Sequence, residues 1–157
     1  MSVETITSGL PNYHPLLVHF PIGLLVYATI MDVIQVVLRQ PTRLKNTTPL
    51  YLVGTVLLVF TYFSGRYAVA SVQTTGMAHV TINDHWSLAT GCLIYFAATS
   101  LARTLLWSSW YKKQPSAMYV FAVTSLVGLV LLVTTADLGG RLVYRYGVGV
   151  ATVSASP

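Results

Sequence analysis

An apolar run from residue 16 to residue 38 limits the folds open to this chain more than any other feature. Only His19, Asp32 and Gln35 interrupt it. A helix rises about 1.5 Å per residue, so this run is long enough to cross a hydrocarbon core about 30 Å thick. The run therefore predicts a transmembrane helix rather than a helix of a soluble protein.

Three further apolar runs follow it along the chain. Hydrophobic residues make up 54% of the sequence and charged residues 8%, whereas about a quarter of the residues are charged in an ordinary soluble domain. We predict an all-α fold, an integral membrane four-helix bundle with helices at about 16–38, 50–72, 85–107 and 116–137. Residues 1–157 form one transmembrane domain in this prediction, and residues 138–157 form an extended tail on its surface.

Local signals predict where these helices begin, bend and end. His14 stands at the expected N-cap of the first helix, and Pro21 should bend that helix because it removes a backbone hydrogen bond. Asp84 is placed to cap the third helix. Gly139 and Gly140 are expected to end the fourth helix.

The distribution of Lys and Arg predicts the orientation. The first and third connectors carry six of the nine basic residues: Arg39, Arg43, Lys45, Arg103, Lys112 and Lys113. By the positive-inside rule these connectors face the cytoplasm, and both termini lie on the periplasmic side of a bacterial inner membrane. The N-terminal segment lacks the features of a cleaved signal peptide, so the first helix should act as the insertion signal. The net charge of +5 is scattered among apolar runs and does not indicate a nucleic-acid partner.

Four crossings bring polar residues that are distant in the sequence to the same depth. All four histidines fall at the outer face, together with the cations Arg66 and Arg141. In the inner half, Asp32 and Arg103 form a plausible pair between the first and third helices. The alternative is that Arg103 extends to the lipid head groups.

Imidazoles at membrane depth suggest a haem iron. His14 and His19 are separated by about 140° around a helix, so one metal cannot take both from a regular helix. A bundle holds haem between histidines of two facing helices, and we predict His19 and His85 as axial ligands of a single haem b, with His14 as a further candidate. Arg66 and Arg141 would contact the propionates. Each histidine also has a simpler interpretation as a helix cap, a solvated residue or a partner of a backbone carbonyl near a proline.

Other chemistries have weaker support. A copper or zinc site needs three or four converging donors, and no HxH or HxxxH spacing prearranges them. The lone Cys92 lies in an apolar run and is expected to be a buried small residue. The sequence has no CxxCH motif, no Walker loop and no dinucleotide fingerprint.

Four segments carry a resemblance that covers all the predicted helices: HPLLVHFPIGLL, SGR, DHWSLAT and LGGRLVYRYGVGV. They resemble a bacterial family of predicted four-helix membrane proteins of unknown function, which opens with HPLxVHFPI and closes with GGxLVYxxGVGV. Members resemble subunits from redox contexts, sometimes joined to cytochrome-c-like domains, and this implies haem or quinone chemistry by association only. The pattern falls on His14, His19, His85, Gly139, Gly140, Tyr144, Gly147 and Gly149.

These observations favour a small cytochrome-b-like or quinone-interacting subunit of a respiratory or photosynthetic electron-transfer complex. Its expected cofactor is haem b, with quinone as a second possibility. Its expected partners are the lipid bilayer, other membrane subunits and a separate cytochrome. Such a protein is an electron-transfer or accessory subunit rather than a stand-alone enzyme. One alternative is a structural subunit without a cofactor, and another is a carrier of metal or small solutes.

Overall fold

A computed structural model describes residues 13–39, 47–70, 72, 74–106 and 116–150 of the chain. These residues form α1 (His14–Leu17), α2 (His19–Val37), α3 (Thr48–Ala70), α4 (Gly76–Leu106) and α5 (Ala117–Tyr144), with no strand among them. α1 and α2 together make the first of four segments that are long and apolar enough to cross a membrane. The predicted four-helix membrane bundle is therefore confirmed.

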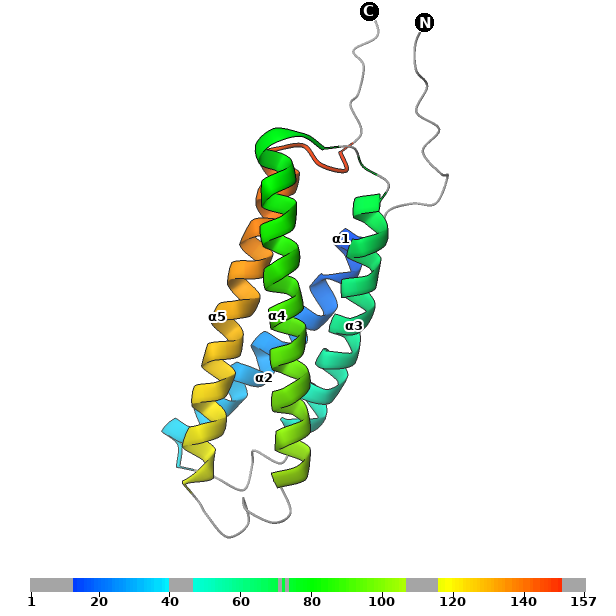
Figure 1. The fold of residues 1–157 in the computed structure, drawn as a ribbon. Coiled ribbons are helices and arrows are strands. Elements are labelled where there is room, and N and C mark those ends of the chain that lie inside the picture. Colours follow the sequence, from blue (N-terminus) through cyan, green and yellow to red (C-terminus); the bar gives the residue numbers. More distant parts are fainter. Residues whose placement is uncertain (1–12, 40–46, 71, 73, 107–115, 151–157) are drawn as a thin grey trace, which may run out of the picture.

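The four membrane segments are arranged in a ring, in which each packs against two neighbours. α2 and α4 each pack against both α3 and α5, and α1 packs against α3 and α2 (Figure 1). The described chain starts and finishes at one end of the bundle, which we call the terminal end. The opposite end, where α2 finishes and α5 begins, is called the connector end (Figure 1).

The first membrane segment is interrupted at Val18, between α1 and α2. Pro21 explains the break, because it has no N–H to donate to the carbonyl of Leu17 and its ring crowds that carbonyl. The Thr61 hydroxyl of α3 donates to the Leu17 carbonyl at 3.4 Å instead. A hydroxyl of a neighbouring helix thus satisfies the acceptor that the proline leaves open.

α4 begins earlier than the sequence predicted. It starts at Gly76, so His79 and Asp84 lie within the helix, and this corrects the predictions of a loop at His79 and of a cap at Asp84. The helix thus extends beyond the apolar stretch that predicted it, and its backbone hydrogen bonds continue through the polar residues before His85.

α5 also ends later than predicted. It continues through Gly139 and Gly140 to Tyr144, which corrects the prediction that these glycines end it. The chain leaves the helix afterwards, where Gly147 and Gly149 have positive φ. Residues 145–150 form turns held by bonds such as that from the Val148 N–H to the Leu142 carbonyl, at 2.8 Å. The rest of the predicted tail, 151–157, lies outside the described residues.

The middle of the bundle is an apolar core with close contacts between helices. Its fully buried members are Leu25, Ala28, Tyr51, Cys92, Phe96 and Leu132. A Cβ at Gly54 would lie 2.7 Å from Leu25, and one at Gly128 would lie 2.9 Å from Phe96. These glycines let two pairs of helices approach closely, and Cys92 is buried as predicted.

Candidate functional site

His14 is the first residue of α1, at the terminal end. Its Nδ1 lies 2.9 Å from the Ser64 hydroxyl oxygen of α3. That hydroxyl is also 2.8 Å from the Thr61 carbonyl. When it donates to this carbonyl, it accepts from the imidazole, and neutral His14 then carries its proton on Nδ1.

His85 has the same tautomer on the other side of the bundle. Its Nδ1 lies 2.9 Å from the backbone carbonyl of Thr135 in α5. A carbonyl only accepts, so Nδ1 carries the proton and Nε2 carries the lone pair. The two histidines thus use their Nδ1 atoms to attach to neighbouring helices.

Each of these imidazoles packs against a glycine. A Cβ at Gly65 of α3 would lie 2.8 Å from Cε1 of His14, and a Cβ at Gly139 of α5 would lie 3.2 Å from Cε1 of His85. Any larger residue would force the ring to move. The SGR and GG segments therefore provide the space in which the two rings are held.

His14 and His85 lie at the same end of the bundle, although they come from the first and third membrane segments. His14 is bound to α3 and His85 to α5. We call them the imidazole pair. His19 and His79 are exposed on α2 and α4.

Both predicted cations lie at the terminal end, and each has a partner of its own. The guanidinium of Arg66 lies 4.3 Å from the ring centroid of Trp86. Arg141 forms an exposed ion pair with Asp137 one turn earlier, at 2.7 Å. Both guanidinium groups are exposed at the end of the bundle that holds the imidazole pair.

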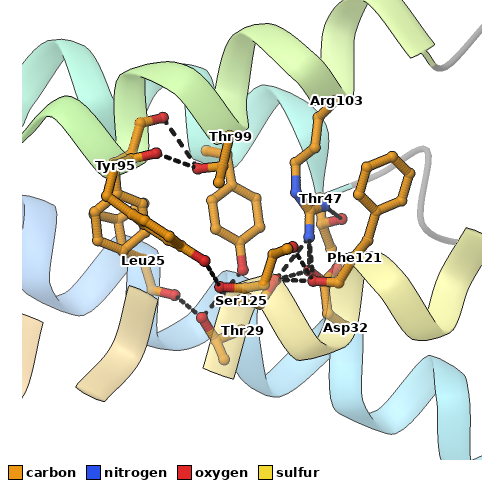
Figure 2. Close-up of polar contacts among 12 residues, drawn as sticks. Leu25, Thr29, Asp32, Thr47, Tyr95, Thr99, Arg103, Phe121 and Ser125 are labelled. Carbon is orange, nitrogen blue, oxygen red and sulfur yellow. Dashed lines mark hydrogen bonds and ion pairs between the residues drawn. The ribbon is translucent and has the colours of Figure 1, made fainter. Parts of the chain in front are cut away.

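A second polar cluster lies inside the connector half, around an ion pair between Asp32 of α2 and Arg103 of α4 (Figure 2). Nη2 of Arg103 also donates to the Ser125 hydroxyl at 2.7 Å and to the Phe121 carbonyl at 3.2 Å. The guanidinium lies 4.0 Å from the ring centroid of Tyr51. The predicted Asp32–Arg103 pair is confirmed, and the structure adds the α5 serine and the α3 tyrosine.

The chain also matches a known family along almost its whole length. The profile of the predicted membrane protein family DUF2231 matches residues 10–152. The chain belongs to this family. No curated protein and no solved structure matches it.

In this DUF2231 protein, all four segments that carried the resemblance contribute to the surroundings of the imidazole pair. HPLLVHFPIGLL supplies His14, SGR supplies Ser64 and Gly65, DHWSLAT supplies His85, and LGGRLVYRYGVGV supplies Gly139. Sequence analysis did not identify Gly65 or Gly139 as neighbours of histidines. The sequence features that could have pointed to these residues are the short, less apolar stretch at the end of α3 and the double glycine in α5.

The terminal end of this DUF2231 protein offers the imidazoles of His14 and His85 as donors for a metal. The described residues contain no group of three or more His, Cys, Asp and Glu side chains that could hold a metal ion. Zinc and copper sites draw three or four ligands from the protein, whereas haem iron takes only its axial ligands from it. The imidazole pair by itself offers two nitrogen donors from separate helices.

Proposed function

We propose that the protein is a small electron-transfer subunit of a bacterial membrane complex, which holds one haem b at its terminal end. The observation that carries this proposal is the imidazole pair, in which His14 and His85 from separate helices each direct Nδ1 to a protein acceptor. Metal-ligating histidines usually make this second hydrogen bond, which fixes the ring and its tautomer. We therefore assign the axial positions to His14 and His85.

The other residues at this end would complete the site. Arg66 and Arg141 are exposed at the same end and would meet the propionates, with Arg66 held by Trp86 and Arg141 by Asp137. A bound haem would supply one-electron chemistry, while the protein would set the ring orientation and limit the access of water. By the positive-inside rule the terminal end faces the periplasm, where a separate cytochrome could exchange electrons with it.

Absorption spectroscopy of the purified full-length protein tests this assignment. The expected result is a Soret band in the wild type, which is lost in His14→Ala and in His85→Asn. Asparagine keeps a donor near the position of Nδ1, so His85→Asn should preserve the bond to Thr135 while removing the ligand nitrogen. His19→Ala is the matched control and should keep the band.

Other results would contradict the proposal. If the Soret band were lost in His19→Ala but retained in His14→Ala, the axial ligand would be His19 instead of His14. A protein that stays colourless after haem addition and copurifies with a large complex would instead be the structural subunit considered above. Stoichiometric copper or zinc without a Soret band would indicate a metal carrier.

A further inference from the structure

A cavity of about 520 Å³ lies at the terminal end, between the end of α3 and the start of α4. Its volume falls within the range of about 300–1,000 Å³ that is typical of small-molecule sites. Residues of both helices line it, among them Val69, Ile82, His79, Asn83 and Trp86. The α4 members follow the spacing i, i+3, i+4 and i+7, so they form one stripe along the helix.

The residues that line the cavity fit a ligand with an apolar body and an uncharged polar head. None of the described residues that line the cavity is Asp, Glu, Lys or Arg. The nearest cation, Arg66, lies over the ring of Trp86 and is not itself a lining residue, so a phosphate or a carboxylate would find no charged partner in the described lining. His79 and Asn83 offer neutral hydrogen-bonding groups one helical turn apart, with about 5–6 Å between their Cβ atoms.

Trp86 gives the cavity a fixed aromatic wall. Its indole Nε1 donates to the Tyr62 hydroxyl at 2.7 Å, and the Arg66 guanidinium lies over its ring. Thr90 also donates to the Tyr62 hydroxyl, at 3.2 Å. These contacts hold the indole in place before any ligand enters, which favours the stacking of a flat ring.

We propose that this cavity binds the head group of a membrane quinone. The quinone ring is planar and uncharged and carries two carbonyl oxygens on opposite sides. Asn83 and His79 would each donate to one oxygen, Trp86 would lie against the ring, and the apolar tail would leave along Val69, near the end of α3, to the bilayer. This site is distinct from the imidazole pair, and the inference does not require a haem.

Binding of decylubiquinone to the purified full-length protein tests the proposal, measured by calorimetry in detergent. We expect saturable binding with one site per chain. His79→Ala and Asn83→Ala should each raise Kd about tenfold, which corresponds to about 1.4 kcal/mol and to the loss of one hydrogen bond. His19→Ala, at another exposed histidine, should leave Kd unchanged.

Two further measurements keep the test decisive. Asn83→Gln and His79→Gln retain donors, so they should bind more tightly than the alanine variants and show whether a loss comes from misfolding. The haem-free variant His85→Asn should still bind decylubiquinone, so failure of the haem proposal would leave this result intact. Absence of saturable binding, or equal Kd values in wild type and His79→Ala, would overturn the proposal. So would native mass spectrometry in which phosphatidylglycerol, rather than the quinone, is retained by wild type and lost from Asn83→Ala.

Discussion

Asp32 and Arg103 lie 71 residues apart in the sequence and form an ion pair whose side chains are almost completely buried. The Ser125 hydroxyl, which is 2.6 Å from Oδ2 of Asp32, adds the fifth helix to the contact. A charged side chain at membrane depth is costly unless it is paired, so this cluster constrains three helices at once. Asp32 Oδ1 and Gln35 Oε1 are buried without hydrogen-bond partners in the described part of the chain, and each remains an acceptor for a donor such as water.

Removal of one member of the ion pair should destabilise the bundle strongly. Asp32→Ala leaves the Arg103 guanidinium buried without its countercharge, and we expect the free energy of unfolding to fall by about 3–5 kcal/mol. The double variant with Asp32→Leu and Arg103→Met should recover most of this loss, because no unpaired charge remains. Denaturant titrations followed by circular dichroism provide the measurement, and a neutral effect of Asp32→Ala would contradict the prediction.

The bond between Thr61 and the Leu17 carbonyl should depend on Pro21. Thr61→Val removes the hydroxyl that satisfies this carbonyl, at a cost of about 0.6 kcal/mol, the average for hydrogen bonds between membrane helices. In a Pro21→Ala background the alanine N–H can take over, so the cost of Thr61→Val should approach zero. A double-mutant cycle of unfolding free energies measures this coupling, and additive effects would show that the two residues act independently.

The glycine beside His14 should not tolerate even one methyl group. Gly65→Ala places a Cβ 2.8 Å from the ring, and we expect a loss of about 1–3 kcal/mol through overpacking. Gly91 is the control, because a Cβ there meets nothing within 4 Å. Gly91→Ala should raise stability by up to about 1 kcal/mol through helix propensity. Equal effects of the two substitutions in denaturant titrations would argue against the close contact at His14.

The ring and the hydroxyl of Tyr51 should contribute unequally to stability. Tyr51→Phe removes the contact of 3.0 Å with the Thr29 hydroxyl, which still donates to the Leu25 carbonyl, so the cost should stay below about 1 kcal/mol. Tyr51→Leu also removes the ring beside the Arg103 guanidinium and should cost about 2–4 kcal/mol. Thermal unfolding of both variants tests the difference, and a larger effect of Tyr51→Phe would show that the hydroxyl dominates.

Much of the architecture could be predicted from the sequence, because the bilayer allows few solutions. Helix length and hydropathy were sufficient for the four crossings, and the cost of an isolated charge was sufficient to pair Asp32 with Arg103. These predictions depended on depth in the membrane, which sequence position determines well.

Details that depend on packing between helices could not be predicted in the same way. Nothing in the sequence indicated that His14, rather than His19, would face a neighbouring helix, because the rotation of each helix is set by its neighbours. Gly139 and Gly140 looked like the end of a helix, yet Gly139 lies inside α5 beside the His85 ring. Polar segments near His79 looked like a loop because local composition does not reveal that a long helix extends beyond the apolar core.

The distance along the chain between the two halves of the buried ion pair also has a consequence for biogenesis. Ribosomes deliver the first hydrophobic segment long before the third and fourth, so the carboxylate of Asp32 is inserted while its guanidinium partner is still unmade. Until Arg103 and Ser125 emerge, the nascent chain carries an acidic group without its ion-pair partner, and this group can enter the apolar region in its protonated, neutral form. A truncated chain that ends before α5 would contain Arg103 but not Ser125. Its bundle would lack one membrane segment and would be a substrate for quality-control proteases.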